Sequence, residues 1–145
     1  EQQFLARLVW LGGRQGLALE GVGAGSWQAL LEAGLLPDLL AWLELDAAAL
    51  EQVPGIGKAR ANKLAASFAR ARQRPLAQWL KALGLPAKQL PPEADWDALA
   101  ARDLAQWQAE AGVGPARAKQ LQAFFRAAEL PALRERLRAV GVPGT

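Results

Sequence analysis

Apolar residues recur every three or four positions along most of this chain, which is the spacing of one face of an α-helix. The segment FLARLVWL begins the pattern, with Phe4, Leu8 and Leu11 on one face. KARANKLAASFARARQR follows it at residues 58–74, with Ala61, Leu64, Ala65 and Phe68 inward. Further short helices are predicted for WQALLEAGL, PLAQWLKAL, WDALAARDLAQW, PARAKQLQAFFRAA and ALRERLRAV. Strand-type alternation is missing and β-branched residues are few, so we expect an all-α fold.

A Gly-apolar-Gly turn interrupts this helical pattern three times. The turns lie in LEGVGAGSWQALLEAGL (residues 19–35), VPGIGKARANKLAASF (residues 53–68) and EAGVGPARAKQLQAFF (residues 110–125). After the glycines, the second and third segments share the sequence x-Ala-Arg-Ala, and a short helix-like segment precedes each of them. The repeated unit is therefore helix, hairpin, helix. We name the turns the first hairpin (residues 21–25), the second hairpin (residues 54–58) and the last hairpin (residues 112–115).

Such a turn at a helix start is suited to binding phosphate. The first N–H groups of a helix have no partner within the helix, and its dipole attracts an anion. Glycine permits unusual backbone conformations and leaves no Cβ in the way of a nucleic-acid backbone. We expect the apolar residue between the glycines to point into the core. The candidate DNA-binding residues are Arg14, Gly21, Val22, Gly23, Gly25, Gly55, Ile56, Gly57, Lys58, Arg60, Lys63, Gly112, Val113, Gly114, Arg117 and Lys119.

The net charge of +3 is unevenly distributed along the chain. Residues 1–51 hold two basic and seven acidic residues, a net charge of −5, whereas residues 52–92 hold eight basic and no acidic residues, a net charge of +8. A basic run often does no more than solvate the outer face of a helix. Because this block starts at the second hairpin, a polyanionic partner is the better explanation.

The composition excludes most self-contained catalytic sites. The chain has no Cys, His, Met or Tyr, so it lacks thiolate and imidazole metal ligands, a Cys nucleophile and a His general base. The absence of Cys fits a reducing compartment. Neither a signal peptide nor a membrane-spanning apolar run is present, so we expect a cytoplasmic protein without a membrane partner. Since the chain starts at Glu1 rather than Met, we expect it to belong to a longer protein.

The hairpins and their order resemble the helix-hairpin-helix region of bacterial NAD-dependent DNA ligases. The resemblance rests on RLVWLGGRQGLALEGVG, LEQVPGIGKARANKLAASFARARQRPLAQWLKALGLP and AGVGPARAKQLQAFFRAAELPALRERLRAVGV, which cover nearly the whole chain. The chain has no Cys for the four-cysteine zinc module of the common ligase form, and it ends at GVPGT. In both respects it resembles the shorter B type of NAD-dependent DNA ligase. The resemblance implies two paired helix-hairpin-helix units, which we place at residues 1–85 and 86–145. A further hairpin near Gly84 is degenerate, because Pro86 follows it and Pro91-Pro92 break any helix.

The resemblance also implies a function. The chain would bind nicked double-stranded DNA without sequence specificity, across the minor groove, as a monomer beside an upstream catalytic domain of a bacterial protein. That longer protein would seal nicks in replication and repair with NAD and magnesium, and this chain would itself bind no cofactor and hold no catalytic residue. Two alternatives stay open: a hairpin module of another repair protein, such as an excision nuclease or a junction-binding subunit, or a helical scaffold that binds protein.

Several other side chains have two interpretations. Trp residues can stack on bases, but helical spacing among Leu and Ala favours the core for Trp27, Trp42, Trp79 and Trp107. Asp95 and Asp97 resemble a metal pair but are better explained as carboxylates at a helix start. Ser26 is available as an N-cap.

Overall fold

The computed structural model describes residues 2–90 and 95–145, so Pro91 and Pro92 lie outside the described residues. Within those ranges the secondary structure is helical and no strand occurs. The helices are α1 (Gln2–Gly12), α2 (Ala24–Glu32), η1 (Ala41–Glu44, a 3₁₀ turn), α3 (Ala47–Glu51), α4 (Lys58–Ala71), α5 (Leu76–Ala82), α6 (Trp96–Ala100), α7 (Leu104–Gln108), α8 (Pro115–Arg126) and α9 (Leu130–Ala139). The all-α prediction is confirmed.

The chain divides into two compact units, Glu1–Arg74 and Pro75–Thr145. The predicted boundary between hairpin pairs, after residue 85, falls inside the second of these units. The assignment of the pairs to residues 1–85 and 86–145 stays a prediction.

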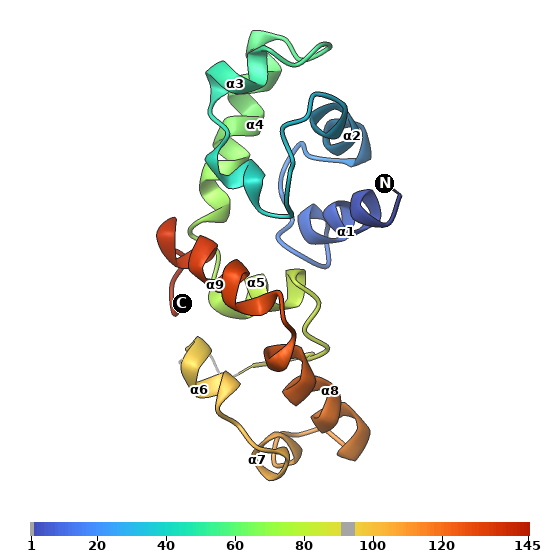
Figure 1. Ribbon diagram of the computed structural model, residues 1–145, viewed down its shortest axis with the longest axis vertical. Coiled ribbons are helices and arrows are strands. Elements are labelled where there is room, and N and C mark those ends of the chain that lie inside the picture. The colour runs from blue at the N-terminus through green and yellow to red at the C-terminus, as the bar shows by residue number, and fades with distance from the viewer. Residues whose placement is uncertain (1, 91–94) are drawn as a thin grey trace. The chain divides into compact units, whose positions relative to one another are not determined.

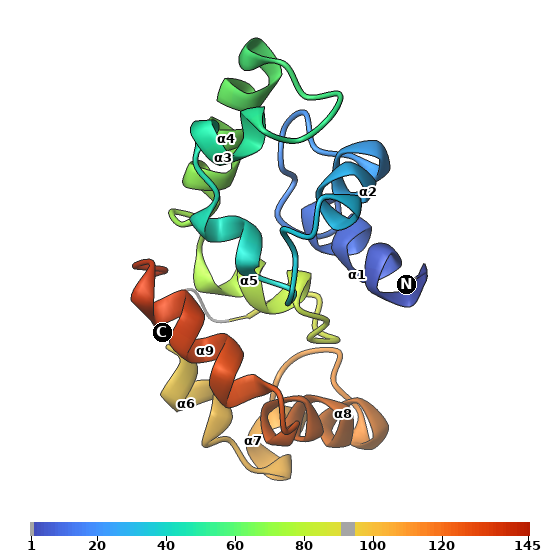
Figure 2. The same ribbon diagram turned by 45° about the horizontal axis from the view of Figure 1, so that its top comes forward.

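The first unit packs two helix pairs around three aromatic rings. Figures 1 and 2 show α1 beside α2 and α3 beside α4. The Trp27 ring stacks on Phe68 with 5.8 Å between ring centroids, and Trp42 meets Phe68 at 5.1 Å. These three side chains are at most 1% exposed. Large buried aromatic rings contribute much of the apolar area of a small core, so this cluster holds the two hairpins of the unit on one body.

The second unit repeats this plan with a different core. Here α7 packs on α8 (Figure 1), while Phe125 lies between Trp107, on which it stacks, and the edge of Trp96. Near the end of the chain, the Gly144 carbonyl accepts a hydrogen bond of 2.9 Å from the Trp96 amide, which ties the terminus to the start of α6. Trp79 and Trp107 are buried like Trp27 and Trp42, so the predicted core role of these four residues is confirmed.

Three local expectations need correction or refinement. The segment 96–107 forms two helices rather than one, because the Asp103 side chain caps a new helix, α7. The helix predicted for residues 58–74 ends at Ala71. Ser26 is not an N-cap: α2 begins at Ala24 after the N-cap Gly23, so Ser26 lies in the first turn, where it is 3% exposed. By contrast, Asp95 caps α6 as expected for a helix-start carboxylate.

No helix in the described ranges has the length and apolar character needed to cross a membrane.

Candidate nucleic-acid interface

The three hairpins have one backbone geometry. The first glycine of each, Gly21, Gly55 or Gly112, has a φ between 76° and 88°, in the left-handed region that L-residues with a side chain rarely adopt. One turn hydrogen bond closes each hairpin, from the amide of the apolar residue to the carbonyl three residues earlier, at 3.0 to 3.3 Å. The second glycine is in each case the N-cap of the following helix, with extended backbone. The hairpins therefore present the same atoms in the same order.

The helices after the hairpins begin without a side-chain cap. Gly23, Gly57 and Gly114 cap α2, α4 and α8, and none of these helices has a side-chain hydrogen bond at its cap within the described chain. The short helices α3, α6 and α7 differ, because an Asp side chain accepts from the backbone at each start. An Asp cap uses the amide groups that an anion would otherwise occupy. The helices that follow a glycine hairpin thus keep their first amide groups available. The helices α5 and α9 also lack a side-chain cap, but they follow no glycine hairpin.

Open space surrounds the second glycine of each hairpin. A Cβ added at Gly23, Gly57 or Gly114 would meet no heavy atom of the described protein within 4 Å. Their backbone conformations do not require glycine, since φ lies between −83° and −129°. Packing and conformation therefore do not explain these glycines. Close approach of another molecule's backbone would explain them.

Apolar anchors fix the hairpins to the units to different degrees. Ile56 is 4% exposed, as predicted, whereas Val22 and Val113 are half-buried. The last hairpin has an additional polar attachment next to Val113: Glu110 pairs with Arg102 at 2.7 Å. The Arg102 guanidinium in turn lies 4.8 Å from the centre of the Trp107 ring. The last hairpin is therefore linked through Arg102 to the buried Trp107 ring.

The predicted basic residues fall into two groups. Arg14, Lys58, Lys63 and Lys119 are exposed, and their side chains have no hydrogen-bond or ion-pair partner in residues 2–90 and 95–145. Arg60 and Arg117 have partners inside the protein: Arg60 Nη2 donates to Ser26 Oγ at 2.8 Å, and Arg117 Nη1 donates to the Pro86 carbonyl at 3.1 Å. The sequence predicted that Arg60 and Arg117 bind DNA, but it did not predict these two hydrogen bonds within the protein. All six residues are exposed, but only the first four have side chains without a partner in the described residues, whereas Arg60 and Arg117 each donate a hydrogen bond within the protein.

Near the end of α4, fewer basic side chains are available to a partner than the positive charge of residues 52–92 suggested. Arg72 donates to the Leu43 carbonyl at 2.6 Å, and Arg74 donates to the Leu17 carbonyl at 3.1 Å. Arg70 lies 3.9 Å from a carboxylate oxygen of the exposed Glu20. These arginines tie α4 to the rest of the first unit. The charge open to a partner is therefore concentrated at the hairpin end of α4, on Lys58 and Lys63.

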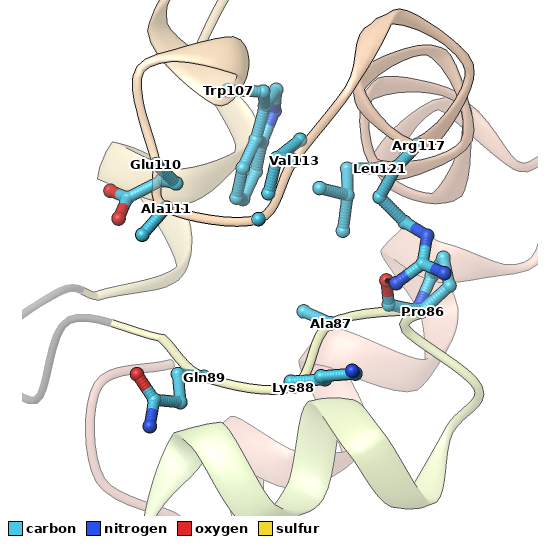
Figure 3. A pocket seen from close by; sticks show the side chains of 11 residues that line it. Pro86, Ala87, Lys88, Gln89, Trp107, Glu110, Ala111, Val113, Arg117 and Leu121 are labelled. Carbon is cyan, nitrogen blue, oxygen red and sulfur yellow. Dashed lines mark hydrogen bonds between the residues drawn. The ribbon is translucent and has the colours of Figure 1, made fainter.

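The degenerate hairpin near Gly84 keeps its turn but not the helix that should follow. Gly84 has φ of 108°, a positive value as at the other hairpins, and Leu85 is buried like Ile56. Residues 86–90 are not helical, and a cavity of about 290 Å³ lies between them and the last hairpin. Figure 3 shows this cavity bounded by Ala87 and Gln89 on one side and by Val113 and Leu121 on the other. No helix start with open amide groups forms here.

No group of three or more acidic side chains in the described residues is arranged to hold a metal ion.

Comparison with known proteins agrees with this geometry. Residues 16–70, which contain the first and second hairpins, match the family model described as SAM-like helix-hairpin-helix tandem. The part of the chain that matches is thus similar to a tandem of helix-hairpin-helix motifs. The match begins before the first hairpin and ends one residue before the last residue of α4. The tandem therefore corresponds to the two glycine-capped helices of the first unit.

The whole chain is similar to one part of a DNA ligase. It is 46% identical over 145 residues to the DNA ligase B of Pseudomonas putida (strain W619), an alignment that covers 99% of this chain. The same alignment covers 26% of that ligase, so the chain spans about a quarter of its length. The predicted resemblance to the helix-hairpin-helix region of a B-type ligase is confirmed.

Proposed function

We propose that this chain is a double-stranded DNA-binding module that holds the phosphate backbone across the minor groove without sequence specificity. The observation that carries the proposal is the repeated pairing of an uncapped helix start with a glycine whose missing Cβ leaves open space. Phosphate oxygens accept hydrogen bonds from such backbone amides. The exposed Lys58, Lys63 and Lys119 would add charge beside the second and last hairpins.

The similarity to DNA ligase B supports a place for this module in a longer enzyme. The resemblance to NAD-dependent DNA ligases implies that this longer enzyme would seal nicks in duplex DNA with NAD and magnesium. We propose that this chain supplies none of the catalytic residues. Its part is to bind the nicked duplex as a monomer and hold it against a catalytic domain upstream, and NAD and magnesium act there.

The test is binding of fluorescein-labelled duplexes to the chain, measured by anisotropy across a salt series. One duplex carries a nick and its counterpart is intact. Each neutralised phosphate contributes about −0.9 to the slope of log affinity against log salt concentration. We expect a slope of several units that does not depend on base sequence. Absence of binding at low salt would refute the proposal and favour a protein-binding scaffold.

A charge-reversal pair makes this test specific. Replacing Lys58 and Lys63 by Glu is expected to abolish binding and preserve the helical circular dichroism spectrum, since neither side chain has a partner in the described protein. Arg126→Glu is the control for each single reversal, Lys58→Glu or Lys63→Glu, which changes the net charge by the same amount; Arg126 lies in the last turn of α8, at the opposite end of that helix from its hairpin. Equal losses from a single reversal and from its control would show a diffuse charge effect and contradict the clamp.

Preference among DNA substrates separates the ligase from other repair proteins. The chain is expected to bind a nicked duplex at least as well as a four-way junction or a bubble. A strong preference for junctions or bubbles would instead favour a nuclease or junction-binding module.

A further inference from the structure

The arginine of the shared x-Ala-Arg-Ala sequence lies at the same position of two helices. Arg60 is the third residue after the N-cap Gly57, and Arg117 is the third residue after the N-cap Gly114. Both positions are in the first helical turn, among the amide groups that have no partner within the helix. A simple phosphate-binding role would leave both guanidinium groups pointing to solvent.

In the first unit, Arg60 instead crosses to the other hairpin. Its guanidinium donates to the hydroxyl of Ser26 at 2.8 Å, and Ser26 is 3% exposed. Ser26 is the third residue after the N-cap Gly23, so the bond joins equivalent positions of α2 and α4. The hydrogen bond therefore connects the two helix starts whose open amides form the proposed DNA contacts.

The second unit has a corresponding bond in a different form. Arg117 donates to the carbonyl of Pro86, and Figure 3 shows its side chain extending from α8 toward that residue. Pro86 follows Gly84 by two residues, as Gly23 follows Gly21, so it occupies the position of the missing N-cap. The arginine thus reaches the preceding hairpin in both units, although one acceptor is a side chain and the other is backbone.

We propose that Arg60 is a positioning residue, which sets the separation of the two glycine-capped helix starts of the first unit, and that Arg117 makes the corresponding bond between the last hairpin and the Gly84 turn. The inference rests on the proposed DNA-binding function. Two amide clusters can hold the same duplex only if their separation matches that of the phosphates, and the hydrogen bond from Arg60 Nη2 to Ser26 Oγ restricts that separation. Arg60 acts on DNA through the position of the first hairpin rather than by its own charge.

Ser26→Ala is the central test because it changes no charge. We expect it to weaken binding of the nicked duplex about tenfold, the factor that corresponds to one hydrogen bond from a charged donor. Arg60→Ala is expected to cause a similar loss, and the double variant no more than either single one, since both remove the same bond. Lys63→Ala is the matched control on α4. Its loss of DNA affinity is expected to add to that of Ser26→Ala, and the slope of log affinity against log salt concentration is expected to become smaller by about one.

A distance measurement without DNA tests the positioning itself. Because the chain has no Cys, the exposed Glu32 and Asn62 can be replaced by Cys for spin labels on α2 and α4. Electron–electron double resonance is expected to give a broader distance distribution in Ser26→Ala and Arg60→Ala than in Lys63→Ala. The helical circular dichroism spectrum of Ser26→Ala, recorded in parallel, shows whether this variant keeps its fold.

The outcomes separate this inference from the proposed function. If Ser26→Ala binds DNA like the unaltered chain while Arg60→Ala is weaker, Arg60 contacts phosphate directly and the positioning role is wrong. An unchanged distance distribution in both variants would overturn it as well. If the unaltered chain fails to bind any duplex, the proposed function is refuted together with the DNA part of this inference.

Discussion

Replacing Gly57 by Ala separates the needs of folding from those of DNA binding at the second hairpin. Gly57 has φ of −83°, which any L-residue adopts, and an added Cβ meets nothing within 4 Å. Alanine is a poorer N-cap than glycine by roughly 0.5 to 1 kcal/mol. It also restricts the unfolded chain, which stabilises the folded state by about 0.4 to 1 kcal/mol. These two effects nearly cancel, so the free energy of unfolding is expected to change by less than about 1 kcal/mol.

The effect on DNA binding is expected to be much larger. The new methyl group would occupy the open space beside the first amides of α4, through which a phosphate would have to approach. A hydrogen bond to a charged group contributes about 1.5 to 3 kcal/mol. Loss of one such bond lowers affinity by about 10- to 150-fold. Gly57→Ala is therefore expected to bind DNA poorly while remaining folded.

The assay combines a thermal melt followed by circular dichroism with anisotropy on a nicked duplex at one salt concentration. Gly55→Ala is the matched control two residues away, because Gly55 has φ of +88°. Left-handed backbone costs an L-residue about 1 to 2 kcal/mol, which lowers the melting temperature of a small domain by roughly 4 to 16 °C. The reasoning is refuted if Gly57→Ala binds within twofold of the unaltered chain, or if it melts as early as Gly55→Ala.

Three further substitutions test other parts of the structure. Phe68→Ala removes the ring that packs on both Trp27 and Trp42, so it should destabilise the first unit by about 3 to 5 kcal/mol, measured by urea unfolding. Asp103→Ala removes the cap of α7 and should cost about 1 kcal/mol of stability, with DNA affinity unchanged at a temperature where the protein is folded. Lys119→Ala should leave the melting temperature within 2 to 3 °C and lower the salt slope for DNA by about 0.9. A lost helix in the last variant, or weaker DNA binding in the Asp103 variant, would contradict these assignments.

The helices and the aromatic core were predictable because they depend on local periodicity. Trp27 and Phe68 lie at helical spacing among Leu and Ala, and the same spacing that forms the helix directs both rings inward. The hairpins were predictable for a similar reason, since glycine is the residue that favours the positive φ observed at Gly21, Gly55 and Gly112.

Helix boundaries were harder to predict, because several local signals compete. Ser26 has the chemistry of an N-cap, but Gly23 starts α2 three residues earlier and leaves the hydroxyl inside the helix. Asp103 could equally have been an exposed residue within one long helix. A capping box with Gln106, in which each side chain bonds to the other's backbone, makes it a helix start instead.

The contacts of Arg60 and Arg117 could not be predicted from the sequence. Their acceptors lie 34 and 31 residues away along the chain, and one of them is a backbone carbonyl that no residue type reveals. Charge alone placed both arginines with Lys58 and Lys63. The three-dimensional structure is needed to see that the two arginines are bonded within the protein, whereas the two lysines are open to a partner.

The two units share a repeat that was only partly visible in the sequence. The segment from Asp46 to Gly57 corresponds to that from Asp103 to Gly114, with an Asp cap, a five-residue helix and a glycine hairpin in each. The preceding hairpins differ, because Gly23 starts a helix whereas Pro86 does not. The first unit therefore presents two uncapped helix starts that follow a glycine hairpin, and the second unit presents one. If amide groups bind the phosphates, the first unit contributes the larger share of DNA affinity, and it is also the unit that contains Lys58 and Lys63.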